Sequence, residues 1–414
     1  MPKQTTEIIA IGDELSSGQR LDTNSQWLSH QLTSIGLSVQ YHNTVADDVN
    51  AITDVIRAAI KRSDFIIVTG GLGPTADDLT REALATAIDK PLVENAEALQ
   101  HIINLFVQRG RHMAPNNLKQ ALMPQTATLI HNAQGTAPGV DTIVDAGPHR
   151  PRVFCLPGVP AEMKLMFNSH VIPAIRQNML GIPQITRHFV LKTFGIGESD
   201  LEHKLPEIFQ RDRTPIVGIT ASNATITLRV QVTAASEKEC QTLAQPTLDK
   251  IVEKLGDVVF ARHEVELGTK VCQLLFQNGE SIATWECGTK GQLAAMLHAP
   301  LYPALVASRF HLPTGEFSLL PDTPSVELTK LAIDFRKVTK ATYAIVVGPV
   351  RPPNQSGNTV PHFNVAIAHE NHNELQTHDF TGHPDILLAK AAKQAINQLR
   401  LYMKNTHCTP PSHN

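Results

Sequence analysis

The sequence lacks the features that mark membrane, disulfide-linked and nucleic-acid-binding proteins. No apolar run approaches the roughly 18 residues of a membrane-spanning helix, and the N-terminal residues lack the apolar core of a secretion signal. Aromatic residues make up only 5% of the chain and form no basic-aromatic cluster for stacking on single strands. The cysteines are odd in number, widely spaced and without a Cys-x-x-Cys motif: Cys155, Cys240, Cys272, Cys287 and Cys408. This spacing argues against a disulfide framework and a thiolate zinc site.

The length, hydrophobic content and charge balance of the chain predict a soluble protein of several domains. At about 150 residues per domain, 414 residues correspond to roughly three domains. Hydrophobic residues make up 42% of the chain, which is enough for sizeable cores. Because Lys and Arg (36) nearly balance Asp and Glu (39) and form no basic tract, a nucleic-acid partner is not expected. We expect a cytoplasmic protein that binds neither a membrane nor nucleic acid.

The first third of the chain alternates predicted strands with predicted helices. Short apolar runs at 6–11 and 64–69 have the length of buried strands, and 39–45 is predicted to form a strand between them. A helix is predicted after Asp22, and an amphipathic stripe at 52–60 predicts another. This alternation predicts an α/β domain with a mostly parallel sheet and helices on both faces.

The loop after the third strand, residues 69–78, carries the most informative motif, Thr-Gly-Gly-Leu-Gly-Pro-Thr-Ala-Asp-Asp. Its glycines let the backbone turn sharply and bring N–H groups against an anion, and a helix predicted to begin near Asp77 would add its dipole. Two carboxylates beside a phosphate would repel it unless a divalent cation lay between them. The loop therefore predicts a phosphate and a metal together. The alternative is a structural turn in which Asp77 or Asp78 caps the helix.

Acidic residues also follow the first two predicted strands: Asp13, Glu14, Asp47 and Asp48. Taken alone, Asp47 and Asp48 favour a helix-capping pair. However, parallel strands end at one edge of a sheet, where ligands collect, so we expect these acidic groups to converge. Small and polar residues fill three later loops, which form a rim to the site or are plain turns: 116–121, 132–139 and 156–163.

Motifs in this part of the chain match one known family in identity and order. They span about 160 residues and are 12–15 with Gly18 and 22–24, then 47–48, 69–80, 119–121, 132, 135–139, 156–160 and 162–163. In them the chain resembles the CinA family, whose first domain is similar to the molybdopterin-binding MoaB/Mog fold. The resemblance implies metal-dependent hydrolysis of a nucleotide diphosphate such as ADP-ribose, with a divalent metal (Mg, Mn or Co) and K+. It also implies ancestral binding of a small nucleotide or pterin phosphate in the same pocket.

Diphosphate cleavage requires charge neutralisation and an in-line water, and this chemistry suggests roles for the residues. We expect Asp13, Asp48 and Asp78 to hold the metal, with Asp48 and Asp78 in the catalytic set. Glu14 or Asp77 would be the base, and the sequence leaves that choice open. The expected phosphate- and ligand-binding residues are Gly12, Asn24, Thr69, Gly70, Gly71, Gly73, Pro74, Thr75, Gly135, Thr136, Ala137, Pro138, Gly139, Pro157 and Gly158.

The middle of the chain, residues 176–262, predicts a small α+β domain after a first domain at 1–175. Its expected elements are strands at 188–193 and 225–232 and helices at 200–209 and 236–255. The Gly-Ile-Gly segment at 195–197 resembles a KH-type loop only weakly, whereas 194–199 matches the family's middle domain better. We interpret this domain as a linker or dimerisation domain rather than an RNA-binding one, and expect a homodimer.

Residues 263–405 are similar to the family's α/β C-terminal domain, which in active members is a nicotinamide mononucleotide deamidase. The family has Ala-Glu-Ser-Cys-Thr-Gly-Gly with the serine as nucleophile, whereas this chain has Trp-Glu-Cys-Gly-Thr-Lys-Gly at 285–291. Cys287 stands at the serine position and Lys290 replaces a glycine. A Tyr-Ser stretch and lysine base have no counterpart between 302 and 320.

We interpret this C-terminal domain as a degenerate deamidase kept for structure or assembly, followed by a tail at 406–414. The alternative is that Cys287 acts as a nucleophile whose thiolate Lys290 stabilises. Five histidines between 362 and 383 carry no metal motif, so we expect them on a solvated surface. Two functions remain for the whole chain: a metal-dependent hydrolase, or a non-catalytic nucleotide- or molybdopterin-type binding or scaffold protein.

Overall fold

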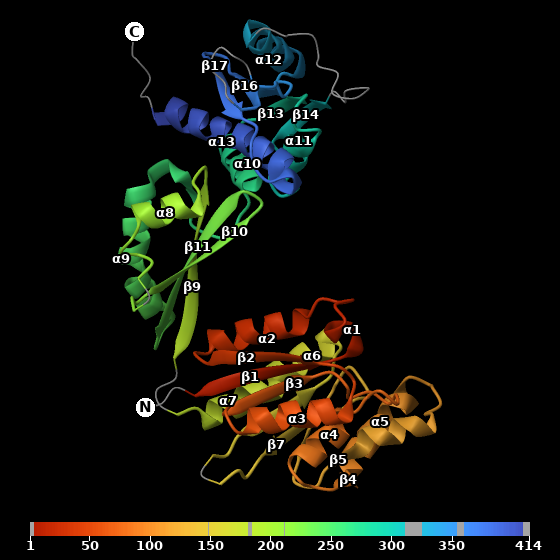
Figure 1. The fold of residues 1–414 in the computed structure, drawn as a ribbon. Helices are drawn as coiled ribbons and strands as arrows, with labels where there is room; N and C mark the ends of the chain where they lie inside the picture. The colour runs from red at the N-terminus through yellow and green to blue at the C-terminus, as the bar shows by residue number, and fades with distance from the viewer. Residues whose placement is uncertain are drawn as a thin grey trace. The chain divides into compact units, whose positions relative to one another are not determined.

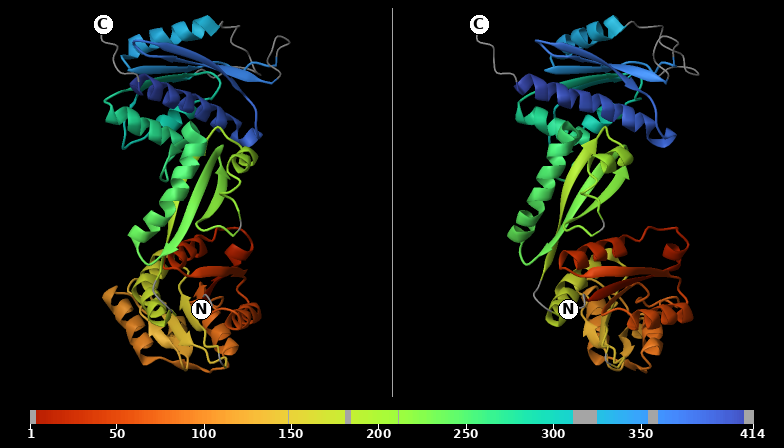
Figure 2. Two further views of the ribbon diagram at one scale, coloured as in Figure 1. Left: turned by 90° about the vertical axis from the view of Figure 1, so that its left-hand side faces the viewer. Right: turned by 60° about the vertical axis from the view of Figure 1, so that its left-hand side comes forward.

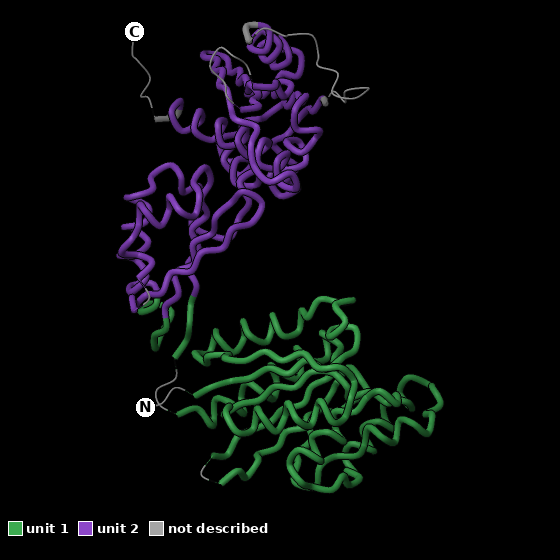
Figure 3. The backbone as a smooth tube through the Cα atoms, viewed as in Figure 1, with its two compact units in different colours: residues 1–187, 233–240 green, residues 188–232, 241–414 purple. Residues whose placement is uncertain are grey.

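The computed structural model describes residues 4–147, 149–180, 184–210, 212–310, 325–353 and 360–408 (Figure 1). The chain divides into two compact units, one of residues 1–187 with 233–240 and one of residues 188–232 with 241–414 (Figure 3). Over the described ranges, none of the helices combines the length and the apolar composition that crossing a bilayer requires.

Within the described residues, unit 1 is built on a six-stranded sheet with the strand order β2-β1-β3-β8-β7-β6. The parallel strands are β2 (Ser38–Val45), β1 (Thr5–Ile11), β3 (Phe65–Thr69) and β8 (Arg152–Leu156). The antiparallel strands are β7 (Gly139–Ile143) and β6 (Thr128–Ile130). The prediction of a mostly parallel sheet is confirmed, because short buried apolar runs do form its central strands.

Helices cover both faces of this sheet, as predicted (Figure 2). One face carries α2 (Thr23–Ser34), α6 (Pro160–Met166) and α7 (Ile172–Asn178). The other carries α3 (Val49–Ile60), α4 (Thr80–Ala87) and α5 (Ala96–Gln108). Neighbouring residues of β1 serve the two faces in turn: Ile8 lies in the cluster that contains Leu28 of α2, and Ile9 lies in the opposite cluster.

Short elements connect these strands and helices. They are α1 (Asp13–Ser16), β4 (Leu92–Glu94), β5 (Leu122–Pro124), a 3-10 helix at Pro115–Ala121 and a π-helix at Phe167–Val171 between α6 and α7. The start of α2 follows the sequence prediction, since the Asp22 carboxylate accepts the Ser25 amide at 2.9 Å.

The middle segment forms a sheet with the order β10-β11-β9-β12. Its strands are β9 (Ile185–Phe194), β10 (Ile216–Ser222), β11 (Thr225–Ala234) and β12 (Val259–Ala261), and its helices are α8 (Glu198–Lys204) and α9 (Glu237–Leu255). The helix expected at 200–209 is therefore wrong in its bounds. It begins directly after the glycine pair and ends five residues earlier than predicted.

The C-terminal segment has a sheet with the order β14-β13-β15-β16-β17. Strands β14 (Leu305–Phe310), β13 (Ile282–Glu286) and β15 (Tyr343–Val347) are parallel, and β16 (His362–Ala368) and β17 (Asn373–Asp379) are antiparallel. One face carries α12 (Ser325–Thr339), and the other carries α10 (Leu267–Gln277), α11 (Gln292–Leu297) and α13 (Leu387–Cys408). Because α13 continues to Cys408, the first residues of the expected tail are helical, and 409–414 lie outside the described residues.

The expectation that the C-terminal histidines form a solvated surface is wrong for His362, and His369 and His378 are only partly exposed. His362 is 5% exposed, and His369 stacks on Tyr343 with ring centroids 4.9 Å apart. The ring of His378 shares a 2.8 Å hydrogen bond with the Gln398 side chain of α13. The cause is the β16–β17 hairpin, which the polar, turn-rich composition of this segment concealed.

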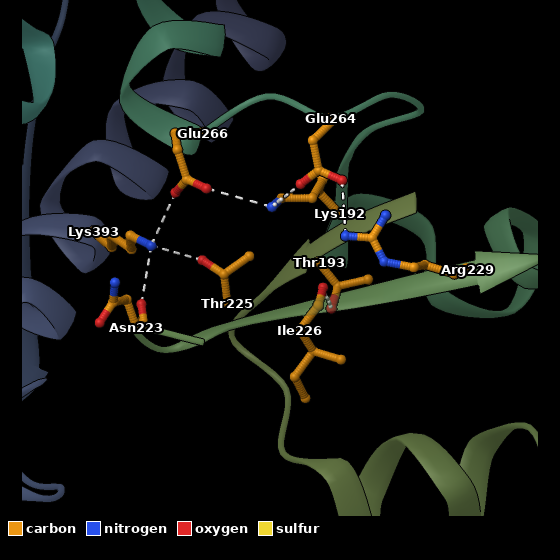
Figure 4. A network of polar contacts seen from close by, with 9 residues as sticks. All are labelled: Lys192, Thr193, Asn223, Thr225, Ile226, Arg229, Glu264, Glu266 and Lys393. Atoms are coloured by element: carbon orange, nitrogen blue, oxygen red, sulfur yellow. Dashed lines mark hydrogen bonds and ion pairs between the residues drawn. The ribbon is translucent and has the colours of Figure 1, made fainter. Parts of the chain in front are cut away.

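A network of charged groups joins the middle sheet to the C-terminal segment within unit 2 (Figure 4). The buried Lys192 of β9 pairs with Glu264 at 2.9 Å and with Glu266 at 3.3 Å. The buried Lys393 of α13 pairs with Glu266 at 3.3 Å and donates to the Thr225 hydroxyl at 2.8 Å. Both buried lysines therefore have a carboxylate partner, and the two glutamate side chains remain partly exposed to solvent.

A buried ion pair also anchors the edge of the unit 1 sheet. Asp141 of β7 is 3% exposed and bonds Arg152 of β8 at 2.7 Å and His170 at 2.8 Å. Burial by itself would raise the pKa of Asp141, but the hydrogen bonds and charges of Arg152 and His170 outweigh burial and hold it below its ordinary value of 3.8.

We predict that Asp141→Ala lowers the free energy of unfolding of unit 1 by about 3 kcal/mol at pH 7, because it leaves Arg152 half-buried without its partner. Since the folded-state pKa is depressed, this stabilisation is present above the unfolded pKa and is lost as the pH falls through the folded pKa. The deficit should therefore shrink below pH 3.8. Urea unfolding followed by Trp27 fluorescence in a Trp285→Phe background measures it. The exposed Asp145→Ala is the control, and a deficit that persists unchanged at low pH would contradict the assignment.

Candidate functional site

A cavity of about 540 Å³ opens in unit 1 at the carboxyl ends of the parallel strands. Loops that follow β1, β2, β3 and β8 contribute to its wall, together with the loop before β7. This is the edge at which open α/β sheets bind ligands. The residues that we predicted for the site and that line this cavity are Gly12, Glu14, Gly70, Gly71, Gly73, Pro74, Asp77, Asp78, Thr136, Ala137, Pro157 and Gly158.

The glycine loop needs its glycines for conformation and for space. Gly70 and Gly71 have φ angles of +106° and +63°, which disfavour any side chain. A Cβ at Gly70 would lie 2.2 Å from the Ile11 carbonyl oxygen, and one at Gly71 would lie 2.3 Å from the Thr80 hydroxyl. The loop therefore packs backbone against backbone at the end of β1.

The first residues of α4 hold the loop from behind. The carbonyls of Gly70 and Gly71 accept from the Thr80 hydroxyl at 2.8 Å and from the Thr80 amide at 3.1 Å. Arg81, which is 1% exposed, donates to the carbonyls of Leu72 and Gly73, each at 2.8 Å. The expectation that the helix begins near Asp77 is wrong, because α4 begins at Thr80. Arg81 is not among the residues predicted for the site, and its position directly after the motif was the signal that could have identified it.

The loop at 116–121 braces the glycine loop from outside. Lys119 Nζ donates to the carbonyls of Asp78 at 2.5 Å and Thr75 at 3.3 Å, and Asn116 Nδ2 donates to the Pro74 carbonyl at 3.3 Å. The Thr75 amide in turn donates to the Asp78 carboxylate at 2.8 Å. Thr75 thus positions Asp78 and does not itself line the cavity.

The metal set Asp13, Asp48 and Asp78 does not assemble. The Asp48 carboxylate accepts the Ala51 amide at 2.8 Å and caps α3, which was the alternative for this residue. Asp13 and Asp47 exchange hydrogen bonds: each amide donates to the other's carboxylate, at 2.9 and 3.0 Å. Asp47, not Asp48 or Asp13, lines the cavity. Across the part of the chain that the structure describes, no group of three His, Cys, Asp or Glu side chains is placed to hold a metal ion.

The cavity wall is strongly acidic. Burial raises the pKa of Asp47 above its ordinary value of 3.8. The charges of Asp13, Asp77 and Glu14 raise it further, against the lowering effect of the hydrogen bond from the Asp13 amide. Asp78 and Glu162 also line the cavity, and Arg20 is its basic residue. An anion could enter this site only with a compensating positive charge.

A smaller cavity of about 40 Å³ adjoins the first and shares Glu14, Arg20 and Gly158 with it. Asn24 and Thr69 lie here, where the Asn24 amide nitrogen donates to the Thr69 hydroxyl at 3.2 Å and to the Gly158 carbonyl at 2.9 Å. The Asn24 side chain thereby fixes the loop after β8 to the end of β3.

The segment 132–139 enters the wall only in part. Thr136 and Ala137 line the cavity, whereas Gly135, Pro138 and Gly139 lie behind it. Gly135 provides room, since a Cβ there would lie 2.2 Å from the Glu162 carboxylate. Asn132 Nδ2 holds that carboxylate at 2.7 Å and keeps it at the cavity.

In unit 2, the residues around Cys287 do not activate its thiol. Burial raises the pKa of Cys287, and the charge of Glu286 raises it further. Lys290 is exposed in a left-handed conformation (φ +51°), and it does not lower that pKa. Glu286 is fully buried and accepts the amides of Leu293 and Ala294 at 3.0 and 2.9 Å, so it caps α11. Most of the stretch in which we sought a second deamidase segment, 311–320, lies outside the described residues.

Comparisons with known proteins divide the chain at a similar place. The probable molybdopterin binding domain family matches residues 7–177, and the damage-inducible protein CinA KH domain matches residues 188–261. The second match identifies residues 188–261 as similar to a KH domain. In the sequence, the glycine pair at 195 and 197 indicated this resemblance only weakly.

The chain is similar over most of its length to curated bacterial proteins. It is 33% identical to a competence-damage inducible protein of Bacillus velezensis over 94% of this chain and 95% of that protein. A relative from Bacillus subtilis is 39% identical over 72% of this chain and 70% of its own length. Among solved structures, the protein CinA of Thermoplasma acidophilum, described as of unknown function, is 33% identical over 42% of this chain and 98% of that chain, with a TM-score of 0.37.

We predict that Gly70→Ala lowers the free energy of unfolding of unit 1 by more than about 1 kcal/mol, because the new Cβ would overlap the Ile11 carbonyl and strain the positive φ. Gly158→Ala is the matched control from the same cavity, since its Cβ would meet the Gly70 Cα at an ordinary 3.5 Å. Urea unfolding monitored at Trp27 in the Trp285→Phe background compares them. Equal stability of the two variants would contradict the close packing described here.

Proposed function

The chain belongs to the CinA family of competence-damage inducible proteins, and from this premise we propose that unit 1 hydrolyses a nucleotide diphosphate such as ADP-ribose with a divalent cation. The observation that carries the proposal is the single cavity in which the carboxylates of Glu14, Asp47 and Asp77 share the wall with the glycine loop. Carboxylates provide metal ligands and a base, and the loop provides backbone amides for phosphate oxygens.

The size of the cavity supports a ligand of this class. Its volume of about 540 Å³ lies within the usual range for small-molecule sites. Because the glycine loop forms one part of the wall and Thr136 and Ala137 form another, a diphosphate on the loop leaves room for the rest of a nucleotide or a pterin.

The residues present fit a divalent cation only if the ligand helps to bind it. Magnesium-type ions are commonly held by one or two carboxylates together with substrate phosphates, which agrees with a wall that has no preformed three-ligand group among the described residues. We assign this role to two of Glu14, Asp47 and Asp77. The cation would neutralise charge on the diphosphate, and the remaining carboxylate would accept the proton of the attacking water.

A second candidate is a protein that binds a nucleotide or a molybdopterin-type ligand without turnover. The observation that favours it is the position of Asp13 and Asp48, whose carboxylates are used in hydrogen bonds outside the cavity. A site with fewer carboxylates than expected suffices for binding. In either case we propose that the C-terminal segment has lost the deamidase activity, since Cys287 stands at the position of the family's serine, Lys290 replaces a glycine, and burial raises the pKa of the Cys287 thiol.

We predict that the full chain releases AMP from ADP-ribose only with Mg2+, Mn2+ or Co2+ present, as followed by phosphorus NMR with and without K+. Asp47→Asn should reduce kcat by on the order of 100-fold, because it removes a carboxylate from the cavity wall. Asp48→Asn is the matched control: its amide oxygen still caps α3, so turnover should change little. Tight binding of ADP-ribose without AMP release would favour the second candidate, and equal losses in the two variants would contradict the assignment of Asp47.

We also predict that the full chain releases no ammonia from nicotinamide mononucleotide in a coupled assay at pH 7, because the raised pKa keeps Cys287 in its unreactive thiol form. Ammonia release that disappears in Cys287→Ala would overturn this prediction. Cys272→Ala, which removes a buried thiol of the same unit, is the control for the substitution itself.

A further inference from the structure

Arg81 is buried in an unusual way for an arginine. It is 1% exposed, yet its guanidinium bonds two backbone carbonyls of the glycine loop and no carboxylate in the described part of the chain. Its Nε is buried and makes no hydrogen bond to a described residue. The charges of Glu82 and Asp78 act on it only through space. A buried cation without a bonded anion is costly, so negative charge bound close to it would be stabilised.

The hydrogen bonds behind the loop determine where its amides point. Three consecutive carbonyls, those of Gly70, Gly71 and Leu72, accept from Thr80 and Arg81 at the start of α4. In a planar trans peptide the N–H points opposite to the C=O. The amides of the next residues in each case therefore face away from α4.

Those amides belong to Gly71, Leu72 and Gly73, and all three residues line the cavity. None of the three donates to an acceptor within the described ranges of the chain. Successive free amides that face one cavity form an anion-binding concavity. Arg81 bonds the carbonyl of one of these peptides, Leu72–Gly73, so its positive charge lies behind the Gly73 amide and adds to the positive potential that this amide presents to the cavity. Its second contact, with the Gly73 carbonyl, holds the peptide that precedes Pro74 and so fixes the end of the loop.

The cavity wall is negatively charged, so an anion needs the positive charge of Arg81 in order to bind there. Glu14, Asp47, Asp77, Asp78 and Glu162 line it, and Arg20 is its basic residue among the described residues. A diphosphate adds further negative charge. One divalent cation offsets part of this total, and the buried guanidinium offsets another part at the face that receives the phosphates.

We propose that Arg81 is a positioning residue of the anion site: its two carbonyl contacts hold the glycine loop with the Gly73 amide toward the cavity, and its charge selects a ligand that carries a diphosphate over a neutral nucleoside. This inference rests on the proposed function, because it needs the ligand's phosphates to lie on the glycine loop. A purely structural role would be served by a neutral buried hydrogen-bond donor of similar length, such as glutamine, and this difference can be measured.

The experiment compares Arg81→Lys, Arg81→Gln and Arg81→Met with the unaltered full chain by calorimetry in the presence of Mg2+. The probe is the uncleavable α,β-methylene-ADP, and adenosine is the neutral reference. We expect Gln and Met to weaken binding of the probe by at least about ten-fold and Lys to keep it within about three-fold, with adenosine unchanged in all. Arg400→Gln, at a buried arginine of unit 2 that also donates to a carbonyl, is the matched control.

Each outcome separates the inference from the proposed function. If the unaltered chain does not bind the probe, the proposed function fails and the inference fails with it. If it binds and the folded Gln and Met variants bind equally well, the inference alone is overturned. If Gln keeps the affinity that Met loses, hydrogen bonding suffices and the role of charge is overturned. Should Gln and Met not give cooperative thermal unfolding, Lys decides: retained affinity supports the proposal, and lost affinity in a folded Lys variant overturns it.

Discussion

The hydrogen bonds between the start of α4 and the glycine loop are the constraint on which the site depends. Thr80 and Arg81 together bind the carbonyls of four consecutive residues, Gly70 to Gly73. The loop in turn packs on the carbonyl of Ile11 and so fixes the end of β3 against the end of β1. The cavity wall is therefore continuous with the sheet, and its geometry follows from the core on both faces of that sheet.

Much of unit 1 could be predicted from the sequence because local patterns decide it. Buried apolar runs predicted strands β1 and β3, and Asp22 caps α2 where its position before a helical pattern indicated. The glycine loop was recognisable because only glycine fits where neighbouring atoms leave no space for a Cβ. Asp47 and Asp48 could not be separated: only the direction in which the chain leaves β2 decides which carboxylate caps α3 and which faces the cavity.

Other parts of the site depend on contacts distant in sequence. The sequence around Arg81 does not show whether this arginine is buried or exposed. It is buried because it bonds the carbonyls of Leu72 and Gly73, nine and eight residues earlier in the chain. In unit 2 the histidines were misjudged because β16 and β17 pair and pack on α13. There too, Lys192 of the KH-type segment is bonded by Glu264 and Glu266, so this basic side chain serves the junction within unit 2 (Figure 4).

The exchange of hydrogen bonds between Asp13 and Asp47 links two loops that are 34 residues apart in the chain. Each backbone amide donates to the other loop's carboxylate, so a change in the length of either loop would break both hydrogen bonds. An insertion in the loop after β1 would consequently alter the conformation of the loop after β2. Surface loops usually tolerate changes in length, but at these two loops such a change would cost the hydrogen bonds that hold them together.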